Sequence, residues 1–165
     1  MNKEKLHEIA QGLMDIATKN LIRDGNLFPV AFVVRPGGVM EIGPVPMSSD
    51  RAKDATSDML KEFVREGAKA VGLITEAWTV SLSDPTGEDT EAYRTGRKRV
   101  RTDPLRKEAI VINAACRDGD LSLIGAFDRD PAGTPLPPKK VEAMWAGVDG
   151  VRLEGRFANF FHELN

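Results

Sequence analysis

The longest apolar and β-branched run in the chain, residues 68–82, limits the possible folds most strongly. Its sequence, AKAVGLITEAWTVSL, has the composition of a strand at the centre of a sheet. Strand alternation puts Glu76 on the same face as Ile74, Trp78 and Val80, so one carboxylate lies within an otherwise apolar row. We therefore predict that residues 68–82 form the central strand and that Glu76 marks a place to look for function.

Hydrophobic periodicity predicts the elements that precede this strand. Apolar residues at three-and-four spacing indicate amphipathic helices at 2–23 and at about 51–66. The first helix is expected to end at Gly25, and the second to begin after a cap at Ser48, Ser49 or Asp50. Between them, short runs rich in valine and phenylalanine indicate paired strands at 27–35 and 39–42.

A second hairpin is predicted where Asp118-Gly119 separates two apolar runs. With these two residues as the turn, Cys116 lies opposite Leu121, and the apolar side chains of both strands share one face. The same count places Glu108 opposite Arg129, an opposite-charge pair. The predicted fold is a two-layer α+β domain, with a mainly antiparallel five-stranded sheet and two long helices on one face.

Length and composition suggest a single domain over residues 1–165. The net charge of −2 gives no general attraction to nucleic acid or to an anionic membrane. No apolar leader and no run of 18 apolar residues occurs, so we expect a soluble cytoplasmic protein. Residues 83–104 lack apolar periodicity and are expected to form a mobile loop, and residues 131–140 a proline-rich extended connector. The tail is expected to close with a short helix containing Phe157, Phe160, Phe161 and Leu164.

Two resemblances add to this interpretation. The element order over residues 6–128 resembles that of the roadblock and profilin-like folds, which implies a small-molecule sensor or a dimerising scaffold. The phrases TEAW, at residues 75–78, and DPLRKEAIVI, at residues 103–112, resemble a pattern in uncharacterised bacterial and phage proteins. That second resemblance implies no particular activity.

Glu76 is the candidate catalytic residue. A carboxylate on a buried face must be paired or protonated, and both outcomes shift its pKa, as in catalytic acids and bases. The alternative is a structural ion pair, for example with Arg101 or Arg106.

Residues 101–108 form the second candidate site, where a charged loop meets a strand. Arg101 and Arg106 could hold a carboxylate or phosphate of a small anionic ligand, with Asp103 beside them. Trp78 is a further candidate, as an anchor in the core or at an interface. The alternative for these charged residues is that they are solvated and pair across strands.

The basic run 93–101, which begins with Tyr93, could bind single-stranded nucleic acid, but the acidic half of the same loop argues against it. No spacing of His and Cys indicates a metal, and no glycine-rich or nucleophile motif indicates a cofactor or a covalent mechanism. The sequence therefore favours a non-enzymatic interaction module that self-associates as a homodimer. The alternatives are an enzyme that uses Glu76 on an anionic substrate and, third, a nucleic-acid-binding protein.

Overall fold

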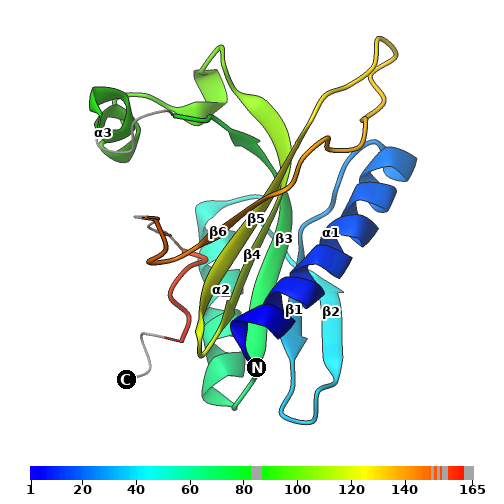
Figure 1. Ribbon diagram of the computed structural model, residues 1–165, viewed down its shortest axis with the longest axis vertical. Coiled ribbons are helices and arrows are strands. Elements are labelled where there is room, and N and C mark those ends of the chain that lie inside the picture. Colours follow the sequence, from blue (N-terminus) through cyan, green and yellow to red (C-terminus); the bar gives the residue numbers. More distant parts are fainter. Residues whose placement is uncertain (83–86, 150, 152, 154–155, 162–165) are drawn as a thin grey trace.

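One antiparallel sheet forms the centre of the molecule (Figure 1). The computed structural model describes residues 1–82, 87–149, 151, 153 and 156–161. Its strands lie in the order β2-β1-β3-β4-β5-β6. The α+β class and the antiparallel sheet are confirmed, but six strands are present where five were predicted. In chain order the elements are α1 (Lys3–Asp24), β1 (Val30–Val34), β2 (Met40–Pro44), α2 (Asp50–Arg65), β3 (Ala70–Thr79), α3 (Glu88–Arg94), a 3-10 turn η1 (Val100–Thr102), β4 (Lys107–Cys116), β5 (Gly119–Phe127) and β6 (Glu142–Trp145).

Local signals fix the ends of both long helices. The Asn2 side chain accepts a hydrogen bond from the Lys5 backbone N–H at 2.9 Å, which caps the start of α1. Gly25 ends this helix with a left-handed φ of 80°, as predicted from its lack of a Cβ. At the start of α2, the Ser49 hydroxyl accepts from the Ala52 N–H at 3.1 Å. Both helices therefore lie where periodicity and caps predicted them.

The two helices lie on opposite faces of the sheet, and the prediction of both on one face was wrong. We call these faces the α1 side and the α2 side. Helix α1 packs with Phe32, Ile74 and Ile112. Helix α2 packs with Ala31, Val33 and Val71 instead. Because successive residues of one strand point to opposite faces, β1 and β3 carry apolar side chains on both sides, and the fold has three layers.

The hairpin of β4 and β5 is shifted from the predicted register by two residues. Cys116 lies opposite Gly119, so Arg117 and Asp118 form the turn rather than Asp118 and Gly119. A shift of two preserves which face each side chain occupies, and the predicted shared apolar face is retained. The predicted partner of Cys116, Leu121, lies opposite Ala114.

Residues 80–82 and 87–105 extend from one end of β3 and β4 away from the sheet, and we call them the arm (Figure 1). It was predicted to be irregular, but it contains α3 and η1. Residues 83–86 of the predicted loop lie outside the described residues, and its mobility stays a prediction.

The C-terminal segment 156–161 packs on the α2 side without forming the predicted helix. Phe160 is buried there beside Leu60 and Val71, and the Ser57 hydroxyl donates to the Arg156 carbonyl oxygen at 2.7 Å. Leu164 of the predicted helix lies outside the described residues. Helical spacing of the phenylalanines was therefore misleading, because their rings attach an irregular segment to the core.

Candidate functional site

Glu76 lies on the α1 side of β3, where its carboxylate joins three parts of the chain. Its Oε2 accepts from the Leu27 backbone N–H at 3.0 Å, and its Oε1 lies 3.6 Å from Nη2 of Arg129. The side chain is 24% exposed, so it is neither isolated from water nor free of partners. The predicted ion pair is present, but its partner is Arg129 rather than Arg101 or Arg106.

Arg129 is the centre of this charged cluster. Its Nε and Nη2 both donate to the Glu108 carboxylate at 2.9 Å, in a bidentate geometry. Its Nη1 donates to the carbonyl oxygens of Gly25 and Gly133 at 3.0 and 3.1 Å. The hydrogen bonds to Glu108 raise the pKa of the Arg129 guanidinium, and the negative charges of Glu108 and Glu76 raise it further. The cluster connects the end of α1 with β3, β4 and the chain after β5. These contacts indicate a structural role.

The predicted ligand-binding residues are only partly brought together. The Arg106 guanidinium stacks over the Trp78 ring, with its Cζ 4.8 Å from the ring centroid. Its Nη1 donates to the Asp103 backbone carbonyl oxygen at 3.1 Å. Trp78 itself is 45% exposed, so it is not a core residue. Arg101 is exposed on η1 and does not line either hollow described below.

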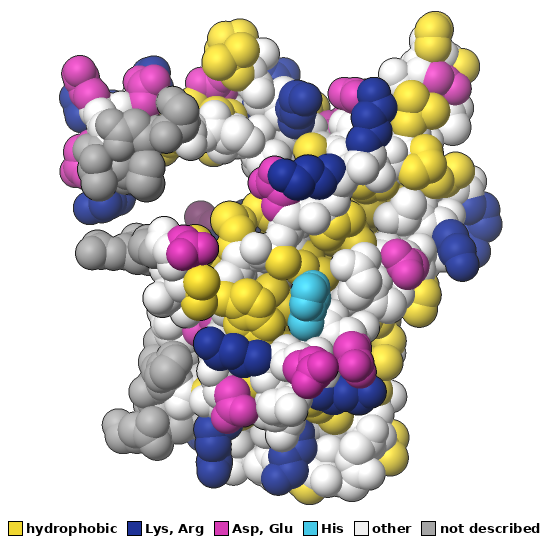
Figure 2. All heavy atoms as spheres, in the orientation of Figure 1, with side chains coloured by type: hydrophobic (Ala, Val, Ile, Leu, Met, Phe, Trp, Pro, Cys, Tyr) yellow, Lys and Arg dark blue, Asp and Glu magenta, His cyan; other side chains and the backbone are white. Residues whose placement is uncertain are grey.

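Two adjoining hollows at the base of the arm form the candidate site, and we call them together the groove. The first, of about 660 Å³, lies on the α2 side between β3–β4 and β5–β6. The second, of about 550 Å³, lies within the arm. Val80, Ser81, Leu82 and Leu105 line both. Figure 2 shows the notch between the arm and the body of the molecule.

The groove exposes apolar side chains that neither helix covers. Leu105 is 76% exposed, Leu136 42% and Leu82 37%. Between these leucines, Ile124 and Met144 of β5 and β6 are half-buried and form part of the floor. Helix α2 covers the opposite end of this face, near Val71, so this part of the sheet is open to a partner.

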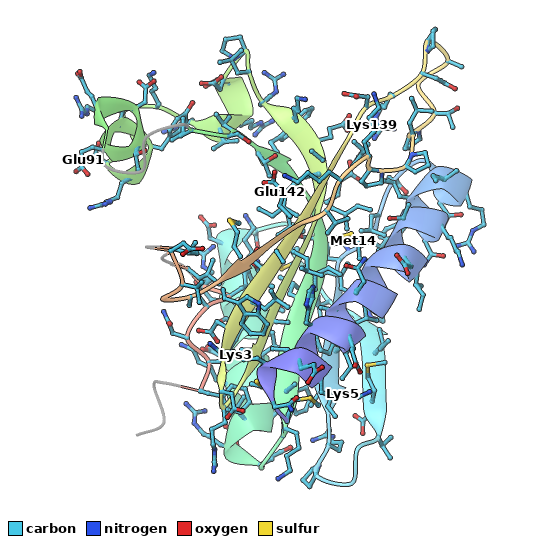
Figure 3. All side chains as sticks on the ribbon, viewed as in Figure 1. Lys3, Lys5, Met14, Glu91, Lys139 and Glu142 are labelled. Atoms are coloured by element: carbon cyan, nitrogen blue, oxygen red, sulfur yellow. The ribbon has the colours of Figure 1, made fainter. Side chains whose placement is uncertain are left out.

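Basic side chains outnumber acidic ones along the groove. Lys98 pairs with Asp89 at 2.6 Å, and Lys140 pairs with Glu142 at 3.1 Å. Four further cations form no ion pair within the described part of the chain: Arg97, Arg99, Lys107 and Lys139. In Figure 3, Lys139 and Glu142 lie along the chain leading into β6, and Glu91 lies across the notch on α3. The lining is therefore suited to a partner with negative charge.

Asp103 holds the arm in shape from inside the second hollow. Its carboxylate accepts from the Tyr93 hydroxyl and from the Leu105 N–H, the latter at 2.7 Å. The hydrogen bond from Tyr93 lowers the pKa of Asp103, and the same bond raises the pKa of Tyr93 to about 12. Asp103 thus lies in the groove as a positioning group for Leu105, and both of its carboxylate oxygens already accept hydrogen bonds from the same chain.

Several groove residues were not identified as site residues in the sequence. Lys139 and Lys140 follow a proline-rich connector, and Leu105 and Leu136 stand as isolated leucines beside prolines. The only sequence signal was a pair of lysines after prolines, because the groove is assembled from three separate segments.

No group of three His, Cys, Asp or Glu side chains among the described residues could hold a metal ion. Within the same residues no helix is long and apolar enough to span a bilayer.

Comparison with known proteins gives no relative from which a function could be inferred. No protein-family model matches the chain, and no curated protein or solved structure matches it either.

Proposed function

We propose that the protein is a non-enzymatic interaction module that binds an acidic peptide segment with apolar side chains in the groove. The observation that carries this proposal is the combination, along one lining, of exposed leucines with cations that form no ion pair among the described residues. Leu82, Leu105 and Leu136 offer contact area to apolar side chains. Arg97, Arg99, Lys107 and Lys139 surround them and favour carboxylates.

A peptide fits this surface better than single-stranded nucleic acid does. Sequence-tolerant binding of nucleic acid uses aromatic side chains on which successive bases stack. In the described lining the aromatic residues are Tyr93 and Phe127; the Tyr93 hydroxyl is bonded to Asp103, and Phe127 is 4% exposed. The floor is aliphatic instead, which favours leucine or isoleucine side chains of a partner.

The enzymatic alternative stays a prediction that rests on Glu76. Its contacts with Leu27 and Arg129 favour a structural role, since both carboxylate oxygens are engaged with groups of the same chain. The groove lies on the α2 side of the sheet, whereas Glu76 lies on the α1 side with Ile74. A substrate in the groove would therefore not reach this carboxylate.

Fluorescence anisotropy with two labelled peptides tests the proposal, one alternating Leu with Glu and the other alternating Leu with Lys. We expect the acidic peptide to bind more tightly, with an affinity that falls as salt is added. The variant K107E/K139E should weaken binding at least tenfold, whereas the matched variant Lys19→Glu on exposed α1 should not.

Two results would overturn the proposal. One is equal binding of the acidic and basic peptides, because the cations of the groove would then contribute nothing. The other is tighter binding of a thymidine oligonucleotide than of the acidic peptide, with the same sensitivity to K107E/K139E. That second result would support the nucleic-acid alternative instead.

A further inference from the structure

Strand β2 lies at the open edge of the sheet, far in the strand order from the groove. It pairs with β1 on one side and is the first strand in the sheet order, so no strand of the described residues lies on its other side. Open edges of this kind are templates for pairing with another chain. Proteins often protect such edges with lysines, prolines or short strands. Residues 40–44 read MEIGP, with no lysine and with their one proline, Pro44, at the end of a five-residue strand, so Met40 and Ile42 stay unprotected.

The backbone groups that point away from β1 can be identified from the hydrogen bonds at the two ends of the β1–β2 hairpin. Arg35 donates its N–H to Val39 at 2.8 Å, and Val45 donates to Pro29 at 3.0 Å. Antiparallel pairs alternate between hydrogen-bonded and non-hydrogen-bonded, so the odd-numbered residues 39, 41, 43 and 45 face β1. Met40, Ile42 and Pro44 therefore direct their backbone groups outward.

The side chains of the same residues make this edge apolar. Met40 lies opposite Val34 and Ile42 opposite Phe32, so both project on the α1 side, where they are 42% and 49% exposed. Beside them Phe28 is 75% exposed. Together with Ile16, at 55%, and with Ile42, Phe28 also lines a hollow of about 200 Å³ next to the strand. An apolar edge with exposed donors is suited to pairing in the manner of an added strand.

We propose that β2 is a self-association edge, on which a second copy pairs antiparallel about a two-fold axis through Ile42. In this register Ile42 lies opposite the partner's Ile42, and Met40 lies opposite the partner's Pro44. Each Ile42 N–H donates to the other Ile42 carbonyl, and each Met40 N–H donates to a Pro44 carbonyl. Every outward N–H of the strand is then bonded, because Pro44 has none to offer.

Charge supports this register as well. Glu41 projects on the α2 side, where the Arg35 guanidinium of the same copy holds its carboxylate at 3.1 Å. The two-fold places Glu41 opposite the partner's Gly43, which has no side chain. An axis through Glu41 would put two carboxylates directly opposite each other, which is unfavourable. An axis through Met40 would require Gly38 to pair as a strand residue, but its φ is 82°.

The pairing joins the two sheets into one and leaves the groove accessible on each copy, since the groove is lined by β3–β6 and the arm. The inference therefore does not rest on the proposed peptide binding, and either can fail alone. A dimer of this kind would present two grooves on one rigid sheet, which strengthens the capture of a partner with two acidic segments.

Disulfide trapping tests the register directly. A hydrogen-bonded antiparallel pair has its Cα atoms about 5.5 Å apart, within the range of about 4.4–6.8 Å that a disulfide needs. Under mild oxidation Ile42→Cys should therefore cross-link to a dimer. Val39→Cys is the matched control, because Val39 is 63% exposed but would lie about 20 Å from its copy in this register. The native Cys116 is buried and provides the unmodified background.

Substituting Ile42, at the proposed two-fold axis, by residues of opposite charge gives a second test in solution. Analytical ultracentrifugation of the unmodified chain at about 100 μM should show a dimer. Ile42→Lys and Ile42→Glu should each sediment as a monomer with an unchanged circular dichroism spectrum, and an equimolar mixture of the two should recover the dimer. An unmodified chain that is monomeric at this concentration, or equal cross-linking of Ile42→Cys and Val39→Cys, would overturn the inference.

Discussion

Two charged regions lie at the end of the sheet from which the arm extends, and they differ in whether their charged side chains form ion pairs. On the α1 side, Arg129 holds Glu108 and Glu76 and also two backbone carbonyls, so each charge has a partner. In the groove on the α2 side, Lys107 and Lys139 form no ion pair with a described residue. An unusual carboxylate in a strand is therefore a weak sign of function when its partner lies in the same fold. Unmatched cations beside exposed leucines are a stronger one.

Among substitutions of charged side chains, removing the arginine of the matched region should have the largest effect on stability. Arg129→Met leaves two carboxylates facing each other without a cation, and we expect it to lower the free energy of unfolding by about 2 kcal/mol. The cluster is 21–28% exposed, which keeps the loss below that of a fully buried pair. Urea denaturation measures it. The control is Arg23→Met, whose pair with Asp24 is exposed, so its loss should lower the free energy of unfolding much less. Equal losses in the two variants would contradict a stabilising role for the cluster.

The two carboxylates of the cluster should differ in importance. Glu76→Gln keeps an oxygen for the Leu27 N–H and leaves Arg129 paired with Glu108, so it should cost about 1 kcal/mol. Glu108→Gln breaks the bidentate pair and should cost more. Thermal unfolding of both variants ranks them. A reversed order would mean that Glu76 is the main partner of Arg129.

The hydrogen bond between Tyr93 and Asp103 should affect the arm but not the global stability. In Tyr93→Phe the pKa of Asp103 should rise towards its usual value, because the bond from the hydroxyl is the main cause of its lowered pKa. The Leu105 N–H, which donates to Asp103, should then exchange faster with solvent. NMR titration and hydrogen exchange measure the two effects.

The pH dependence of this bond follows from the direction of each pKa shift. The pKa of Asp103 is lower in the folded protein than its ordinary value near 4. Its contribution to the stability of the arm is therefore present above about pH 4 and is lost as the pH falls through the folded pKa. The pKa of Tyr93 is raised in the folded protein. Its contribution to the stability of the arm is therefore complete below about pH 10 and is lost as the pH rises towards about 12. Protection of the Leu105 N–H against exchange that does not fall as the pH drops from about 4 through the folded pKa of Asp103 would contradict this assignment.

Sequence predicted the elements better than it predicted how they pack. The caps at Gly25 and Ser49 are local signals, so both helix ends could be predicted. An amphipathic pattern shows that a helix has an apolar face, but not which side of a sheet it covers. The signal for three layers was present in Ala31 to Val34, because a run that is apolar on both faces is typical of a strand covered on both sides.

The site was harder to predict because it, too, depends on how separate elements pack. The hairpin register was two residues out because Asp-Gly favours a turn without specifying which two residues form it. Glu108 and Arg129 were still predicted as a pair, and they do pair, although as diagonal neighbours across the shifted register. The groove could not be predicted, since it depends on where the arm and the connector after β5 pass the sheet.

The smallest effect on stability is expected in the groove, where it separates packing from binding. Leu105→Ala should change the free energy of unfolding by less than about 0.5 kcal/mol, because the side chain is 76% exposed. The matched control is Leu73→Ala on the same side of the sheet, which is 2% exposed and should cost about 3 kcal/mol. If the groove binds an acidic peptide, Leu105→Ala should weaken that binding about tenfold, the loss of one leucine contact. A loss of stability near that of Leu73→Ala, with peptide binding unchanged, would show that Leu105 packs within the fold, and the contrast between the two regions would then rest on charge alone.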